Sequence, residues 1–404
     1  MDTKDTMQIN LQLERAAGID VHQRKIVICY YQRGQPETIR EYETYTCDLE
    51  KIRDDLKSMN IQDVIMESTG IYWISLCSIL STSGVHVRVV NPRFVKNMPK
   101  EKTDKKDAKW LCKLLVNGLV RNSFIASEEQ RAFRDLCRQR SKYSQHITQS
   151  RNRILKNLER RNIKLRSVVS NMNTKSATDI ITAIAWGESD IEKLVLLCKG
   201  KLKKKQDQMR KALVGVIAEH DRDMLKTLLS DIAHYQTQIK KIEEKIHQHT
   251  DKVNKELIEN LQEIKGVGQT STEIILAEVG NNVAAFSTPD KLAAWVGFAP
   301  GNKESAGKSH YSSTRQGNVY LRTALVQVAW GAIRTKNSYW RALFAHLIKR
   351  MPAKKAVIVI ARKLTKVIYK VIKGTMAYIE YGADYFIEKI IQRKNFTGLK
   401  PLEV

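Results

Sequence analysis

The sequence has no long apolar run and little cysteine. No segment approaches the roughly 18 uninterrupted apolar residues of a membrane-spanning helix, and the first residues, MDTKDTMQINLQLERAAG, lack the apolar stretch of a signal peptide. We therefore expect a soluble, cytoplasmic protein without a membrane partner. Six cysteines are scattered without any CxxC pair (Cys29, Cys47, Cys77, Cys112, Cys137, Cys198), which argues against a zinc site and a disulfide framework. We expect most of them to be small core residues kept reduced.

Acidic residues are also in short supply. The 404 residues include 69 lysines and arginines but only 43 aspartates and glutamates, a formal net charge of +26. Solubility alone does not require such an excess, so a polyanionic partner is indicated, with nucleic acid favoured over a membrane surface. The length suggests two or three domains.

The N-terminal part, residues 16–91, has the pattern of an α/β domain. GIDVH, KIVICYYQ and TIREYETYT read as three strands of a meander, followed by a helix in DLEKIRDDLKSM, a buried strand in DVIMEST, a helix in YWISLCSILSTSG ended by Gly84, and a strand in VHVRVVN. This order is expected of an RNase H-like sheet. A further helix begins at TDKKDAKWLCKLLVNG, with Thr103 or Asp104 as its cap. We place this domain at residues 1–125.

A basic, helical connector is predicted at residues 126–255. Between Arg131 and Arg166 there are 12 basic residues against only Asp135 and Glu159, which favours a nucleic-acid-binding stripe over a solvated face. A second helical region is predicted from Lys201 to about Thr250. Its apolar residues recur in steps of three and four, a heptad seam that should pair with a helix of the same chain or of a partner (Leu225, Leu228, Ile232, Tyr235, Ile239, Ile242, Ile246).

The remaining residues, 256–404, are predicted to be mainly helical. LQEIKGVGQTSTEIILAEVG has the GVG turn of a helix-hairpin-helix, whose glycines allow close approach to a phosphate, although plain helix packing explains such a turn equally well. A glycine-rich loop, GFAPGNKESAGKSHYSSTRQGNVYLR, then closes onto a helix. The later segment PAKKAVIVIARKLTKVIYKVIKG contains no acidic residue and is suited to contact a phosphate backbone.

Four carboxylates are arranged as a candidate metal site. Asp20 ends the first strand, Glu67 lies near the end of the strand in DVIMEST, and Asp104 and Asp107 are one turn apart at the start of a helix. Oxygen donors of this kind suit one or two Mg²⁺ ions. Each acid alone has another explanation, in helix capping, a turn or an arginine pair. Their joint order favours the metal.

These residues resemble a known family. GIDVHQRK, MESTGIYW, NPRFVKNMPKEKTDKKDAKWL, IKGVGQTSTEIILAEVG and GFAPGNKESAGK followed by TRQGNVYLR are similar to the DEDD transposases of the insertion-sequence 110 family, over nearly the whole chain. The resemblance implies a RuvC-like domain carrying Asp20, Glu67, Asp104 and Asp107, a helical connector, and a C-terminal transposase domain with Ser305 as nucleophile. It also implies guidance by a noncoding bridge RNA and composite sites, with the acids of one protomer facing the serine of another.

The chemistry expected of Ser305 can be reasoned independently. Attack of an activated serine on a phosphodiester leaves a phosphoserine that conserves the bond energy for rejoining, and Lys303, Lys308 and Arg315 could stabilise the added charge. An isolated serine among glycines is otherwise an ordinary loop residue. We expect nucleic-acid contacts at Arg151, Arg153, Arg160, Arg161, Lys265, Gly266, Gly268, Lys308, Arg315, Arg322, Arg362 and Lys363.

The sequence thus predicts a transposase or site-specific recombinase that binds donor and target DNA and a guide RNA. It should assemble as a homodimer or homotetramer, in a bacterial or archaeal cytoplasm and associated with the nucleoid. Two alternatives stay open. A RuvC-like hydrolytic nuclease, such as a junction resolvase, would form no adduct at Ser305, and a non-catalytic nucleic-acid scaffold would show no magnesium-dependent cleavage.

Overall fold

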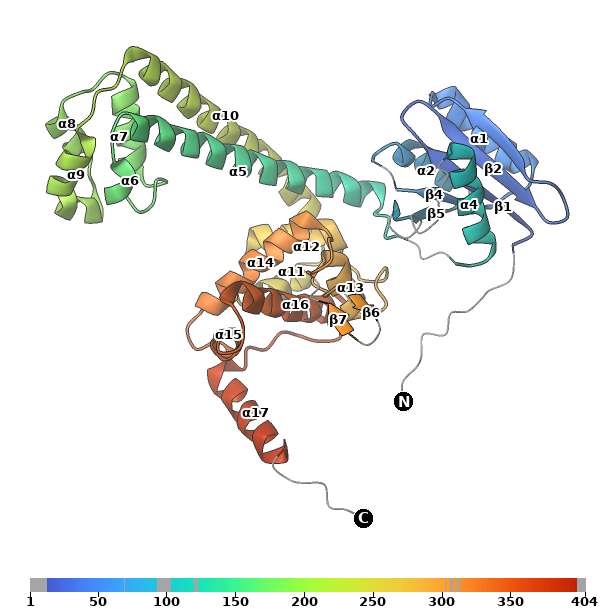
Figure 1. Ribbon diagram of the computed structural model, residues 1–404. Helices are drawn as coiled ribbons and strands as arrows, with labels where there is room; N and C mark the ends of the chain where they lie inside the picture. The colour runs from blue at the N-terminus through green and yellow to red at the C-terminus, as the bar shows by residue number, and fades with distance from the viewer. Residues whose placement is uncertain are drawn as a thin grey trace. The chain divides into compact units, whose positions relative to one another are not determined.

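The computed structural model describes residues 13–68, 70–92, 103–119, 123–301, 303–305, 308–310 and 313–397 (Figure 1). For residues 303–305, 308–310, 389–391 and 393–397 this description covers the backbone alone. The chain divides into two compact units, residues 1–125 and residues 126–404. Each is described by itself.

The first unit contains a five-stranded sheet of order β3-β2-β1-β4-β5. β1 and β2 are antiparallel, as are β2 and β3, whereas β4 runs parallel to both β1 and β5. The predicted meander is therefore confirmed, and the first strand lies beside the DVIMEST strand. The elements are β1 (Arg15–Val21), β2 (Ile26–Gln32), β3 (Thr38–Tyr42), α1 (Thr46–Ser58), β4 (Asp63–Glu67), α2 (Trp73–Thr82), β5 (His86–Val90) and α4 (Asp104–Val116).

The two faces of the sheet are covered by different helices. Ile19 and Met66 pack in one core with residues of α1 and α2. The alternate positions, among them Ile65, pack in a second core with α4. At Gly18 the strand and α4 come so close that an ideal Cβ would lie 2.2 Å from the backbone oxygen of Ala108. Glycine is thus required there by the approach of α4 to β1.

Two long helices dominate the start of the second unit, α5 (Glu128–Arg160) and α10 (Glu219–Thr250). They run antiparallel, because Phe133 near the start of α5 stacks on His249 near the end of α10, while Arg160 at the end of α5 bonds Asp221 at the start of α10. The predicted seam therefore pairs within the chain. Its two ends are buried, and its central residues, from Ile232 to Ile242, are half-buried.

A small helical bundle connects the C-terminal end of α5 to the N-terminal end of α10 (Figure 1). It contains α6 (Leu165–Val168), α7 (Lys175–Ala185), α8 (Ile191–Leu196), a 3-10 helix (Gly200–Lys205) and α9 (Gln206–Leu213). The helical region predicted from Lys201 to about Thr250 is made of the 3-10 helix, α9 and α10, because the chain breaks between α9 and α10. Gly215 lies in this break, where an ideal Cβ would be 2.4 Å from the backbone oxygen of Arg161.

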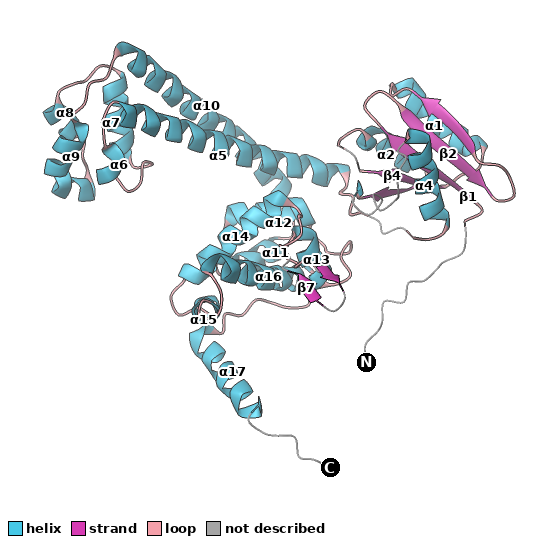
Figure 2. Cartoon of the chain, in the orientation of Figure 1, coloured by secondary structure: helices cyan, strands magenta, loops and turns pink. Residues whose placement is uncertain are grey.

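The rest of the second unit is helical apart from one short hairpin (Figure 2). Its elements are α11 (Lys255–Glu263), α12 (Gln269–Val279), α13 (Pro289–Val296), β6 (Lys303–Ser305), β7 (Lys308–His310), α14 (Val319–Arg334), α15 (Tyr339–Leu347), α16 (Ala353–Ile372) and α17 (Gly382–Thr397). The sequence predicted a loop where β6 and β7 pair. Within the described part of the chain, no helix combines the length and apolar character needed to cross a membrane.

Candidate active site

Strand register places Asp20 beside Glu67. Ile19 pairs with Met66 between the parallel strands β1 and β4, so the next residues along, Asp20 and Glu67, are neighbours on the opposite face of the sheet. This is the face that α4 covers, and α4 begins at Asp104. The oxygen of Thr103 caps that helix by accepting from the backbone N–H of Lys106 at 3.3 Å.

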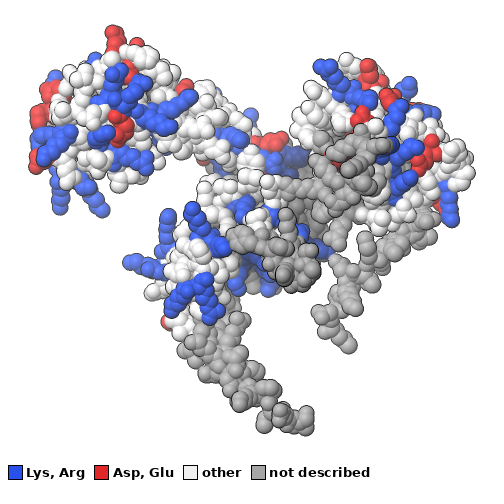
Figure 3. Space-filling model, viewed as in Figure 1, with Lys and Arg blue, Asp and Glu red and all other residues white. Residues whose placement is uncertain are grey.

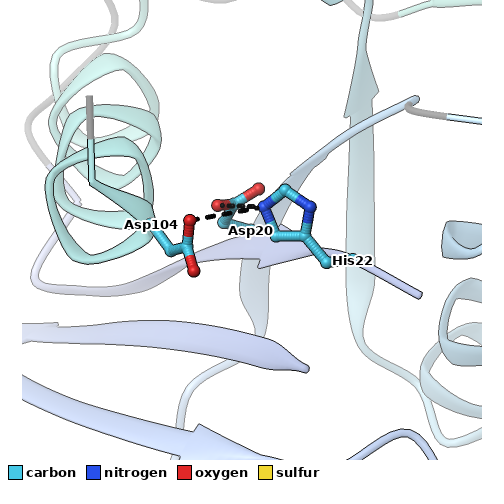
Figure 4. A group of neighbouring side chains, drawn as sticks. All are labelled: Asp20, His22 and Asp104. Carbon is cyan, nitrogen blue, oxygen red and sulfur yellow. Dashed lines mark hydrogen bonds and ion pairs between the residues drawn. The ribbon is translucent and has the colours of Figure 1, made fainter. Parts of the chain in front are cut away.

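Asp20, His22 and Asp104 converge at this corner of the first unit (Figure 4). Nε2 of His22 lies 3.1 Å from Oδ2 of Asp20 and 3.6 Å from Oδ1 of Asp104. Nζ of Lys25 lies 2.7 Å from Oδ2 of Asp104. The strand end, the following turn and the helix start thus meet at one point.

The two aspartates have opposite pKa shifts. Burial raises the pKa of Asp20, His22 opposes this, and the nearby charges of Asp107 and Asp104 raise it further. The pKa of Asp104 is lowered, first by its hydrogen bond with Lys25. Mutual repulsion between Asp20 and its acidic neighbours is the condition that a bound cation relieves.

The donor set fits a divalent cation. Ligand atoms of Asp20, His22 and Asp104 all lie within 4.8 Å of one another. Asp107 is close enough to shift the pKa of Asp20, and register brings Glu67 alongside. Carboxylate oxygens are the ligands that Mg²⁺ prefers.

His22 and Lys25 were not foreseen as members of this group. Both lie in the tight turn between β1 and β2, in which the backbone N–H of His22 donates to the oxygen of Lys25 at 2.9 Å. The sequence did carry a signal: a meander turn directly after Asp20 holds both residues next to that carboxylate.

Ser305 lies at the end of β6, paired with Lys308 of β7. Its side chain and that of Lys308 fall outside the described residues. The loop that carries the hairpin is closed at its base, where Arg322 donates to the backbone oxygen of Gly297 and, at 3.0 Å, to Oγ1 of Thr314. Arg322, a predicted nucleic-acid contact, therefore holds this loop together.

Glu278 of α12 connects the same loop to α5. This buried carboxylate accepts from Nε of Arg138 at 2.8 Å and lies 3.1 Å from Nε of Arg134. It also accepts from Nδ2 of Asn318 at 2.6 Å, and Asn318 caps α14 directly after the loop. Part of the basic stripe of α5 is thus occupied by an acid that lies far along the sequence.

Other predicted contacts in the connector divide into two groups. Arg160 and Arg161 both bond the buried Asp221, at 2.6 and 2.5 Å. Arg153 is exposed, and Arg151 is half-buried with a pKa lowered by that burial. Figure 3 shows lysine and arginine side chains outnumbering acidic ones on the described surface in view.

The predicted contacts of the last segments also differ. Lys265, Arg315 and Lys363 have exposed side chains. Arg362, expected to lack an acidic neighbour, bonds Asp290 of α13 at 3.0 Å, which corrects that expectation because the acid comes from another helix.

The GVG turn joins α11 and α12, and its glycines have different surroundings. Gly266 has a φ of 89°, and an ideal Cβ on it would lie 2.2 Å from the backbone oxygen of Val328 in α14. Gly268 is exposed, and an ideal Cβ there would meet nothing within 4 Å. Packing against α14 therefore explains Gly266, whereas Gly268 leaves the start of α12 accessible.

Comparison with known families places the chain. A family model of DEDD transposases of the IS110 type matches residues 17–163, and a model described as "Transposase IS116/IS110/IS902 family" matches residues 258–345. The chain belongs to the IS110 family of transposases. It is therefore an enzyme that cleaves and rejoins DNA, and the first match contains all four predicted acids while the second contains Ser305.

Curated relatives of this IS110-family transposase are also named as transposases. A "Probable family 20 transposase" of Pseudomonas aeruginosa is 23% identical over 376 residues, covering 91% of this chain and 96% of that protein. A "Putative transposase y4pF/y4sB" of Sinorhizobium fredii is 24% identical, over 76% of this chain and 71% of its own length. The "Transposase for insertion sequence element IS1533" of Leptospira borgpetersenii is 28% identical over 37% of this chain and 44% of its own.

Proposed function

We propose that this IS110-family transposase excises and inserts its element by attack of Ser305 on DNA phosphodiesters, assisted by Mg²⁺ at the acids of an RNase H-like domain and guided by a noncoding RNA. The observation that supports the proposal most is the convergence of Asp20, His22 and Asp104 at the start of α4, with Asp107 close by and Glu67 alongside in register.

The acids would hold the cation and orient the scissile phosphate. Asp20, Glu67, Asp104 and Asp107, which lie on two strands and a helix, would supply the oxygen ligands. Bound Mg²⁺ would offset phosphate charge and lower the pKa of an attacking hydroxyl. Lys25, bonded to Asp104 in the free protein, is placed to exchange that carboxylate for a phosphate oxygen when DNA binds.

The covalent step would exchange one ester for another. The hydroxyl oxygen of Ser305 bonds to phosphorus as the bond from phosphorus to the leaving sugar oxygen breaks, and the serine proton ends on that oxygen. A sugar hydroxyl from another strand then reverses the step and rejoins the DNA. One phosphodiester is lost and one is formed in each cycle, so no external energy source is required.

The proposed assembly is a dimer or tetramer with composite sites. The acids belong to the first unit and Ser305 to the second. In this arrangement the acids of one protomer would serve the serine of another, and two DNA duplexes could be held together. The large positive charge provides the attraction for donor DNA, target DNA and RNA at once.

A covalent-adduct assay tests the mechanism. The protein is incubated with DNA from both ends of its element, RNA transcribed from the flanking noncoding segment, and Mg²⁺, and the products are separated on denaturing gels. We expect a protein-DNA species that disappears in Ser305→Ala and persists in Ser309→Ala, a matched loss of a hydroxyl on the partner strand of the hairpin. Asp20→Asn and Asp107→Asn should abolish cleavage while leaving binding largely intact.

Each component has its own contrary outcome. Cleavage and rejoining at the normal rate by Ser305→Ala would replace the serine mechanism by the hydrolytic nuclease. Full activity of Asp107→Asn in Mg²⁺ would refute the metal assignment, and activity that is unchanged without RNA would refute guidance.

A further inference from the structure

A basic pocket lies between α5 and α10, close to the end of α5. Its volume is about 390 Å³, near the lower end of the roughly 300–1,000 Å³ range of ligand pockets. The lining residues come from both helices: Arg153, Lys156, Asn157 and Arg160 from α5, and His220, Met224 and Leu228 from α10. The pocket belongs wholly to the second unit and contains none of the proposed catalytic residues.

The lining of the pocket is positively charged. Arg153, Lys156 and Arg160 are all exposed, and no acidic residue lines the pocket. The acid that does approach is Asp221, which is fully buried and bonds Arg160 at 2.6 Å. Asp221 thereby fixes one guanidinium at the rim, and Arg153 and Lys156 are ion-paired with no described residue. This rim suits a phosphate.

The interior of the pocket offers the remaining features of a nucleotide site. Asn157 is only 9% exposed, and among the described residues nothing donates to its buried Oδ1. A buried amide oxygen without a partner is unfavourable, so a ligand donor there would gain affinity. Met224 and Leu228 add apolar surface, and the exposed imidazole of His220 provides a ring on which a base can stack.

We propose that this pocket binds one unpaired nucleotide of a single-stranded nucleic acid, with the phosphate at Arg153, Lys156 and Arg160 and the base against Asn157, His220 and Met224. The inference rests on the proposed function only in requiring that the chain handle nucleic acid. A base paired within a duplex can offer neither its Watson–Crick edge to Asn157 nor a free face for stacking on His220, so the site selects an unpaired or extruded nucleotide.

Binding of short labelled oligonucleotides tests the proposal. Fluorescence anisotropy is measured against salt for a single-stranded DNA 12-mer, the same sequence in RNA, the DNA as duplex, and an abasic 12-mer, all with full-length protein carrying Asp20→Asn to prevent cleavage. The double variant Arg153→Ala with Lys156→Ala is compared with Lys240→Ala with Lys241→Ala. The control removes the same charge from exposed positions of α10, outside both the pocket and the basic stripe of residues 131–166.

We expect the pocket double variant to reduce the slope of log K against log salt by about 1.4, because single strands lose roughly 0.7 per phosphate contact, and the control to change it much less. Asn157→Leu should weaken base-bearing single strands about tenfold and leave the abasic strand unaffected. Whichever of DNA and RNA loses more affinity in the pocket variants is the ligand.

The proposal is overturned if the pocket and control double variants have the same salt slope, or if base-bearing, abasic and duplex probes respond alike to the pocket substitutions. If Asn157→Leu does not fold, the two double variants decide. Failure of the pocket leaves adduct formation at Ser305 intact, whereas loss of that adduct with normal oligonucleotide binding refutes the serine mechanism and spares the pocket.

Discussion

Gly18→Ala should test whether cleavage depends on the position of α4, because it moves this helix without changing its acidic residues. An added Cβ would lie 2.2 Å from the backbone oxygen of Ala108 and 2.4 Å from the backbone nitrogen of Cys112. Both are backbone atoms of a helix and cannot rotate away. To restore an ordinary contact of 3.4 Å, α4 must move from β1 by about 1.2 Å.

That displacement acts directly on the candidate site, because Asp104 lies one turn before Ala108 on the same helix. Overpacking of this kind costs about 1–3 kcal/mol of folding free energy. Misplacement of catalytic groups by about 1 Å can reduce the rate roughly 100-fold. We therefore expect Gly18→Ala to fold with a lowered melting temperature and to cleave DNA about 100-fold more slowly at saturating Mg²⁺.

Gly34→Ala is the matched control. Gly34 has a φ of 78° in the turn between β2 and β3, and an added Cβ would meet nothing within 4 Å. Its substitution costs about 1–2 kcal/mol through left-handed backbone strain alone, so it destabilises the same unit without moving α4. If Gly18→Ala cleaves at the rate of Gly34→Ala, the proposed dependence of the site on the approach of α4 is wrong.

Three further changes test the second unit. Glu278→Gln removes the carboxylate shared by Arg134 and Arg138. The free energy of unfolding, measured with urea, should fall by about 2–3 kcal/mol. Burial disfavours the charge of Asp221, yet its bonds to Arg161 and Arg160 leave its pKa lowered overall. This stabilisation is present above the unfolded pKa and is lost as pH falls through the folded one, so the hydrogen-exchange protection factors of α9 and α10, which correct for the slower intrinsic exchange in acid, should fall as pH is lowered, and less so for Asp221→Asn. Gly266→Ala places a Cβ 2.2 Å from the backbone oxygen of Val328 in α14. It should lower the free energy of unfolding in the same assay by about 3 kcal/mol or more, whereas Gly268→Ala should lower it by about 1 kcal/mol.

Each of these has a clear contrary result. An unchanged free energy of unfolding in Glu278→Gln would mean that the ion pairs of Glu278 contribute little to stability. Protection factors in α9 and α10 that stay constant in acid would mean that Asp221 does not anchor the bundle. Equal stabilities of the two glycine variants would mean that packing against α14 does not explain Gly266, and would favour its predicted role as a phosphate contact.

The first unit was predictable in its main features because its signals are local. Short apolar runs bounded by polar breaks identified β1 and β4, and the DxxD spacing at Asp104 and Asp107 predicted one helix face. Parallel pairing of β1 and β4 then brings Asp20 and Glu67 together. His22 and Lys25 belong to the same local information, since the turn that holds them follows directly from the predicted meander.

The basic residues could not be assigned from sequence, because their partners are distant. Glu278 lies 140 residues after Arg138, and Asp221 lies 60 after Arg161. Counting charges within a window therefore overestimated the free positive charge of α5. The hairpin of β6 and β7 was missed for another reason: strands of three residues among glycines and serines carry too little periodicity to distinguish them from a loop.

The unbroken length of α5 sets a spacing within the second unit. Its 33 residues extend about 50 Å at 1.5 Å per residue, with Arg138 fastened to α12 near one end and Asn157 at the pocket near the other. The rise over the 19 steps from Arg138 to Asn157 separates the two places by about 28 Å, somewhat less than the roughly 34 Å rise of one duplex turn. Removing seven residues from both α5 and α10 would preserve their heptad pairing and bring the pocket about 10 Å closer to α12, so the distance between the pocket and α12 is set by the number of helical turns.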